Sequence, residues 1–296
     1  MTASLAGASL RTGTTSRVVD GGALWIAPPL LVMAGCFFYP LSLILRQTFT
    51  GETGSFSLTT LQAVFSSALF HQAILHTVGI ALGASAGCLV LGFVLALILS
   101  FVPFPGSALL ARLIDSVIAL PTFLVALAFT FIYGSAGILN MSLMAAFGLA
   151  APPVDFLYTA WGVILAEVPV YTPFAMRPLL AAFSLIDPAQ IEAAASLGAR
   201  PWRILRRIIL PAALPALLAG GSLCLLLTVN EFGIVLFIGA KGVVTLPLLI
   251  YDKAIQEFDY GTACVIAVVN ILLSLGLYFL YRFAIGRFGG RRAGVV

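Results

Sequence analysis

The stretch Ile191–Pro211 reads IEAAASLGARPWRILRRIILP and decides how the whole chain is interpreted. Four arginines fall within eight residues, Arg200 to Arg207, although charged residues are rare in the rest of the sequence. A small-residue segment precedes the arginines, and a long apolar segment follows Pro211. Concentrated positive charge next to apolar sequence is typical of a loop between membrane segments.

Composition identifies the chain as an integral membrane protein. Of its 296 residues, 61% are hydrophobic and 9% are charged, whereas about 25% of the residues in a soluble domain are charged. A bilayer core requires about 20 apolar residues per helix. We therefore predict an all-α polytopic membrane protein with about six transmembrane helices, near residues 23–45, 72–101, 114–133, 158–182, 213–238 and 261–281. A shorter apolar run, Leu139–Ala150, is expected to be interfacial or re-entrant.

The positions of lysine and arginine predict the orientation, because cytoplasmic loops carry an excess of these residues. With the N-terminus inside, twelve basic residues lie on the cytoplasmic side and three, Arg46, Lys241 and Lys253, on the other. The twelve are Arg11, Arg17, Arg112, Arg177, Arg200, Arg203, Arg206, Arg207, Arg282, Arg287, Arg291 and Arg292. Both termini are thus expected in the cytoplasm, as a disordered tail (1–22) and a basic tail (286–296), on either side of a membrane domain (23–285). The same excess of basic residues on the cytoplasmic side explains the net charge of +4. We therefore do not interpret this charge as a sign of nucleic-acid binding.

The loop 183–211 contains the signals of a short independent helix. Asp187 can cap its start, Pro188 suits its first turn, and Gln190 completes a capping box. Gly198 suits the left-handed turn that ends it. A second helix, which carries the arginines, is expected to end at Pro211, where the membrane begins.

Positive-inside charge explains the arginines, but it does not explain a capped helix of small residues on the cytoplasmic side. The small side chains of Ala193, Ala194 and Ala195 would let the helix backbone lie close to another protein, which suits binding in a groove. The short helix is therefore predicted to be a docking element.

The residues of this loop resemble a known motif. Glu192, Ala193 and Ala194, followed at fixed spacing by Gly198, Ile208, Leu210 and Pro211, match the EAA loop of ABC importer permeases. The resemblance implies the type I importer permease fold and coupling of these residues to an ATPase subunit. It also implies two ATPase subunits, a second permease subunit, identical or homologous, and an external or periplasmic solute-binding protein at the bacterial inner membrane.

Two other segments are similar to one branch of that family. ALPTFLVALAFTFIYGSAGILN and GGSLCLLLTVNEFGIVLFIGAKGVVTLP resemble permeases of 2-aminoethylphosphonate importers, which are related to polyamine, thiamine and ferric-iron permeases. The resemblance implies phosphonate transport, with those three substrates as alternatives.

Motifs for catalysis are missing from the sequence. No phosphate-binding G-x-x-x-x-G-K-[ST] occurs, and the nearest cluster, GAKGV at 239–243, has the wrong spacing. We expect no enzymatic activity, no cofactor and no metal site in this chain, with ATP and Mg²⁺ bound by the partner ATPase subunits. The four cysteines lie in predicted spans and have no disulfide or zinc spacing.

Ionisable groups inside predicted spans are candidates for a translocation path. Glu167 and the neighbouring pair Asn230 and Glu231 are the candidates here. The alternative is that the two carboxylates fix helix packing through hydrogen bonds. An ion-coupled secondary transporter would also use such carboxylates, but it leaves the EAA spacing unexplained. Three prolines, at 169, 173 and 178, predict a broken fourth helix.

Overall fold

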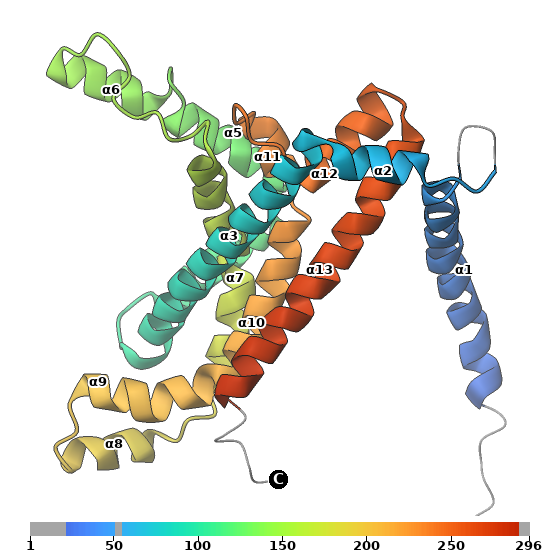
Figure 1. Cartoon of the computed structure of the whole chain (residues 1–296). Coiled ribbons are helices and arrows are strands. Elements are labelled where there is room, and N and C mark those ends of the chain that lie inside the picture. Colours follow the sequence, from blue (N-terminus) through green and yellow to red (C-terminus); the bar gives the residue numbers. More distant parts are fainter. Residues whose placement is uncertain (1–21, 51–54, 290–296) are drawn as a thin grey trace, which may run out of the picture. The chain divides into compact units, whose positions relative to one another are not determined.

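The computed structural model describes residues 22–50 and 55–289. The N-terminal tail expected at 1–22 lies outside this part apart from Gly22, as does the C-terminal tail expected at 286–296 apart from the last backbone turns of a helix. In the described part the chain is helical, and its only β-type pairing is an isolated bridge between Thr50 and Phe56. The all-α prediction is confirmed (Figure 1).

The chain divides into two compact units, Met1–Arg46 and Gln47–Val296. Helix α1 (Gly22–Thr48) provides all of the described part of the first unit, and it contains Pro28, Pro29 and Pro40. Its segment Trp25–Thr48 is long and apolar enough to cross a membrane, as the sequence predicted.

The second unit contains the other helices. They are α2 (Thr59–Ser66), α3 (Ala68–Phe101), α4 (Ser107–Ser116), α5 (Thr122–Tyr133), α6 (Ile138–Phe147), α7 (Ala160–Phe183), α8 (Pro188–Ser196), α9 (Pro201–Ile204), α10 (Leu210–Val229), α11 (Gly233–Ile238), α12 (Leu246–Tyr251) and α13 (Tyr260–Gly289). Three short helical turns of other types join them, η1 (Val117–Ala119), η2 (Leu205–Ile209) and η3 (Asp252–Gln256). With α1, six segments are long and apolar enough to span a membrane, which confirms the predicted number.

Helices α3, α7 and α10 pack against one another and form the centre of the second unit. Small residues allow this close packing. A Cβ atom built on Gly87 of α3 would lie 2.5 Å from Val168 Cγ2 of α7, and one on Gly220 of α10 would lie 3.0 Å from Ala175 Cα. The backbones are therefore so close that neither glycine can gain a side chain without displacing its neighbour.

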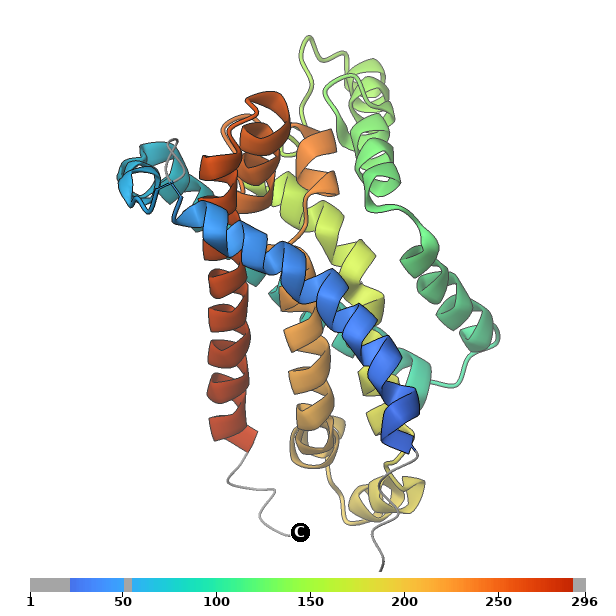
Figure 2. The ribbon, with the colours of Figure 1, turned by 90° about the vertical axis from the view of Figure 1, so that its right-hand side faces the viewer.

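The remaining helices surround this centre. Helix α13 packs against α10, α12 and α2, while α5 packs against α7 and α11. Helices α8 and α9 lie at one end of the second unit, beside the C-terminal end of α13, whereas α6, α11 and α12 lie at the opposite end (Figures 1 and 2).

The predicted break in the fourth helix is wrong. Helix α7 runs without interruption from Ala160 to Phe183 and contains Pro169, Pro173 and Pro178. Prolines are tolerated in membrane helices when neighbouring helices compensate for the lost hydrogen bonds. Here α3 and α10 pack against α7 along its length, and this packing keeps it helical.

The predicted limits of the fifth span are also wrong. Helical structure continues from Pro201 through Pro211 to Val229, so Pro211 does not end a helix. A π-type turn at Leu205–Ile209 ends two residues before Pro211, and its wider hydrogen-bond spacing lets the chain pass a residue that lacks an N–H. The span then ends at Asn230, and α11 is a separate helix.

The third span is displaced along the sequence. Pro121 separates α4 and η1 from α5, so the predicted span at 114–133 is not continuous. The apolar run Leu139–Ala150, which the sequence predicts to be interfacial or re-entrant, contains most of α6. Together with α5, helix α6 makes up the candidate span Thr122–Phe147.

Candidate functional site

Helix α8 begins with the predicted cap and proline, but the predicted capping box is not formed, because the side chain of Gln190 makes no hydrogen bond with the described residues. Asp187 is the N-cap residue, and its Oδ1 accepts a hydrogen bond from the backbone N–H of Ala189 at 2.9 Å. Pro188 occupies the first turn, where its missing N–H would have had no helical partner. The start of α8 is thus fixed by residues within the helix itself.

The end of α8 is fixed in the same local way. Gly198 has φ +77°, in the left-handed region. Its N–H donates to Ala195 O at 2.9 Å, and the N–H of Ala199 donates to Ala194 O at 3.0 Å. These two bonds are the Schellman arrangement that closes a helix C-terminus. The structure confirms the predicted left-handed turn.

The two faces of α8 differ. Ile191 and Ala194 are half-buried and pack against a cluster that includes Phe183 of α7 and Ile204 of α9. Glu192 and Ala193 are exposed. The three alanines therefore do not share one free surface, because Ala194 points toward the rest of the chain.

Leu197 marks the outward side of α8. This leucine is 88% exposed, and Ala195 and Ser196 beside it are exposed as well. A large apolar side chain with this exposure at the end of a capped helix is suited to contact with another protein.

The last three motif residues, Ile208, Leu210 and Pro211, follow the arginines, and Ile208 packs against the cluster that supports α8. Ile208 is half-buried against the same cluster as Ile191, and Pro211 lies near the start of α10. Leu210 is 37% exposed. Arg200, Arg203, Arg206 and Arg207 are all exposed, so the positive charge faces away from the cluster.

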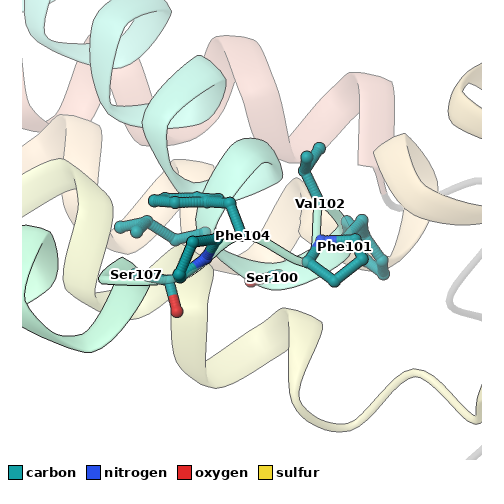
Figure 3. A pocket seen from close by; sticks show the side chains of 8 residues that line it. Ser100, Phe101, Val102, Phe104 and Ser107 are labelled. Carbon is teal, nitrogen blue, oxygen red and sulfur yellow. The ribbon is translucent and has the colours of Figure 1, made fainter.

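A hollow of about 560 Å³ lies in the loop that follows α3 (Figure 3). One continuous segment lines most of it, from Leu99 to Pro105, together with Ser107. Phe101 from this segment also packs against the cluster that supports α8. The hollow is therefore part of the same end of the second unit as α8.

Glu231 is buried and fully engaged. Tyr171 of α7 donates its hydroxyl hydrogen to Glu231 Oε2, and the N–H of Ile234 donates to Oε1 at 2.8 Å. The carboxylate thus holds the first turn of α11 and links it to α7. Sequence reasoning did not identify Tyr171 as its partner.

Asn230 links α10 to α13. Its Nδ2 donates to Leu226 O at 2.8 Å, and its Oδ1 accepts from Asn270 Nδ2 at 3.0 Å. Together, Asn230 and Glu231 have the partners expected of residues that fix packing.

Glu167 has a different environment. Its side chain is completely buried, and neither carboxyl oxygen has a hydrogen-bond partner among the described residues. The structure therefore brings Glu167 and Glu231 near enough to interact electrostatically, through charge of the same sign, but only Glu231 has hydrogen-bond partners.

Comparisons with known proteins place the chain in a family. The family model described as "Binding-protein-dependent transport system inner membrane component" matches residues 88–290, which is more than half of the chain. A Salmonella typhimurium protein named "Putative 2-aminoethylphosphonate transport system permease protein PhnU" is 61% identical over 268 residues, which are 90% of this chain and 94% of the relative. The Escherichia coli "Sulfate transport system permease protein CysT" is 31% identical over 285 residues, 95% of this chain and 98% of the relative.

Solved structures share the fold. A crystal structure of a bacterial ABC transporter involved in the import of the acidic polysaccharide alginate contains a chain with a TM-score of 0.78 and 19% identity, covering 90% of this chain and 96% of that one. From these matches, the chain belongs to the binding-protein-dependent transport system inner membrane components, the permease subunits of ABC importers.

Proposed function

We propose that this permease imports 2-aminoethylphosphonate and that α8 couples it to an ATPase subunit. The observation that carries the substrate is the 61% identity, over nearly the full length of both chains, to a protein named for that transport. The observation that carries the coupling is the capped helix α8 with its exposed outward face, at the position of the EAA motif.

The packing behind α8 provides a route for mechanical coupling. Ile191 and Ala194 contact the cluster that contains Met176 and Phe183 of α7. Helix α7 in turn packs closely against α3 and α10. Because packed interiors transmit displacement, a partner that pushes on α8 would move the central helices. The residues proposed for ATPase coupling are Glu192, Ala193, Ala194, Gly198, Ile208, Leu210 and Pro211.

The charge distribution supports a cytoplasmic location of α8. The four exposed arginines of the α8–α10 segment lie at one end of the second unit. Lys241 and Lys253 lie in and after the α11–α12 region, at the opposite end. By the positive-inside rule, the α8 end of the second unit is cytoplasmic, together with the C-terminal end of α13 beside it. For the N-terminus, the same rule applied to Arg11 and Arg17 in the sequence favours the cytoplasmic side.

The proposed complex contains two ATPase subunits, a second permease subunit and an external solute-binding protein. The ATPase subunits hold ATP and Mg²⁺, whereas this chain has no cofactor and catalyses no reaction itself. Closure of the ATPase subunits would move α8 and switch the permease pair between inward and outward access.

Polyamines, thiamine, ferric iron and, through the 31% identical relative, sulfate are alternative substrates. An ion-coupled secondary transporter has no support from the family to which the chain belongs.

Transport by the reconstituted complex tests the proposal. The complex and its binding protein are placed in proteoliposomes, and entry of radiolabelled 2-aminoethylphosphonate is measured with and without ATP on the ATPase side. We expect uptake that requires ATP and that excess sulfate or putrescine does not inhibit. Uptake that persists without ATP under an ion gradient would contradict the mechanism. ATP-dependent uptake of sulfate or putrescine, without 2-aminoethylphosphonate, would contradict the substrate alone.

A further inference from the structure

We infer that Glu167 is a binding residue for the ammonium group of a cationic or zwitterionic substrate, and that it becomes accessible only when α7 moves relative to its neighbours. The inference rests on the proposed import function. It assigns to one residue of this chain a direct contact with the transported molecule.

Glu167 is the only acidic residue in the six candidate spans. It is the eighth residue of α7, so at about 1.5 Å per residue it lies roughly 10 Å along the helix from Ala160. A carboxyl group inside a membrane helix is costly to insert and marks a candidate functional site. Its position in the span therefore requires an explanation.

Donors on α7 and on the helix packed against it are directed at other acceptors. The Thr172 hydroxyl donates to Val168 O at 2.6 Å, and Tyr171 donates to Glu231. The thiol of Cys88 is directed at Val168 O at 3.5 Å. Neither oxygen of Glu167 has a partner, although buried polar groups in folded proteins nearly always have one.

A second subunit cannot supply the missing partner in this arrangement. Glu167 has no solvent-accessible surface, so no side chain of another protein can reach it unless the helices move. A permanent packing role would be served at least as well by an apolar residue or by a carboxyl group with partners, as Glu231 has. The partner of Glu167 is therefore expected in another conformation of the permease.

The position of Glu167 on α7 connects it to the part of the chain whose movement would produce such a conformation. Helix α7 packs against α3 and α10, and its C-terminal end contacts the cluster beneath α8. Movement of α8 would thus reach the helix that carries Glu167. A carboxylate exposed by that movement would bind an N–H donor with positive charge, which the amine of an aminophosphonate provides.

Substitutions in the reconstituted complex test this inference. We expect Glu167→Gln to keep assembly and binding-protein-stimulated ATP hydrolysis within about two-fold of wild type, while uptake falls at least ten-fold. Glu167→Asp should restore part of the uptake. Glu231→Gln is the matched comparison, because that residue is also buried but its carboxyl has its partners within the chain.

Chemical labelling tests access to the same position and does not depend on uptake. Glu167→Cys should react with a small cationic thiol reagent faster in one nucleotide state than in the others, above the reaction of the native cysteines. 2-Aminoethylphosphonate delivered by the binding protein should slow that reaction. If Glu167→Gln lowers assembly, the labelling decides the question.

Two results would overturn the inference. One is wild-type uptake by both Glu167→Gln and Glu167→Leu, which would leave a packing role. The other is the absence of labelling of Glu167→Cys in every nucleotide state. Failure of the proposed function is distinguishable, because the wild-type complex would then fail to import 2-aminoethylphosphonate at all. If the wild-type complex imports 2-aminoethylphosphonate and the Glu167→Gln variant imports it equally well, the proposed function stands and only the role assigned to Glu167 is refuted.

Discussion

Helix α8 and the interior of α7 represent two different relations between sequence and structure. In α8, Asp187 caps the start and Gly198 closes the end through hydrogen bonds within a few residues. In α7, three prolines lie in an unbroken helix because α3 and α10 pack against it. Local bonds thus determine the exposed helix α8, whereas contacts between distant segments determine the central helices. The difference predicts that substitutions in the two regions will have different effects.

The largest effect on transport is expected from Gly198→Val. A β-branched residue is strained at φ +77°, by roughly 1–2 kcal/mol for the left-handed conformation. The distorted turn should displace α8, so ATP-dependent uptake should fall about ten-fold or more while the amount of inserted protein is unchanged. Uptake in proteoliposomes and immunoblots of the membrane fraction measure the two quantities.

Gly148→Val is the matched control for this substitution. Gly148 closes α6 with φ +63°, and, as at Gly198, a Cβ there would meet no atom within 4 Å. The backbone strain is similar, but the site is at the other end of the second unit. Equal loss of uptake in both variants would show that strain alone, and not the position of α8, explains the effect.

Gly87→Ala should destabilise the centre without acting on α8 directly. The added methyl group would lie 2.5 Å from Val168 Cγ2, and overpacking of this kind costs about 1–3 kcal/mol. We expect a lower thermal midpoint for the detergent-solubilised permease. Gly79→Ala, in the same helix but with no atom within 4 Å of the new Cβ, should leave the midpoint unchanged or raise it. A lower midpoint in Gly79→Ala alone would refute the close approach of α3 and α7.

Glu231→Leu should also destabilise the centre, because it leaves the Tyr171 hydroxyl and the Ile234 N–H without an acceptor. A buried donor without a partner costs about 1–3 kcal/mol. Glu231→Gln keeps one acceptor oxygen and should lose less. Equal thermal midpoints for Glu231→Leu and wild type would show that these hydrogen bonds do not hold α11 to α7.

The smallest effect is expected from Asp187→Ala. Loss of an N-cap side chain costs about 1 kcal/mol, and it acts only on α8. Uptake should fall a few-fold, with no change in the thermal midpoint of the membrane domain. Asp187→Asn retains an acceptor and should behave like wild type. A large drop in the midpoint would mean that α8 is not a locally determined helix.

Sequence reasoning located most of the fold because membrane helices have a strong apolar signal. The number of spans and the start and end of α8 were predicted, since each depends on residues close together in the chain. The limits of α7 were close to those predicted, but its continuity through three prolines was not predicted, because packing against α3 and α10 compensates for them. The limits of α10 were not predicted either, because helical structure continues through Pro211 after a π-type turn. Glycine spacing in α3, with Gly83 and Gly87 four residues apart and both against α7, was a signal for close helix packing that the prediction did not use.

The candidate sites show the same limit. Motif spacing identified Gly198 and Glu192, but it could not show that Ala194 faces inward, since the supporting cluster comes from α7 and α9. Glu167 and Glu231 are similar in sequence terms, and only the contacts of Tyr171 and Ile234 separate them. Side-chain partners contributed by distant segments cannot be inferred from one sequence.

Crosslinking from α8 to the ATPase subunit tests the coupling most directly. Single cysteines replace Ala193 and Leu197 on the outward face, and Ala194 on the inward face. In the assembled complex, Ala193→Cys and Leu197→Cys should crosslink to cysteines placed along the facing surface of the ATPase subunit, with yields that change between the nucleotide-free and ATP-bound states. Ala194→Cys should crosslink much less. No crosslink from either outward position in any nucleotide state, or a stronger one from Ala194→Cys, would contradict the account.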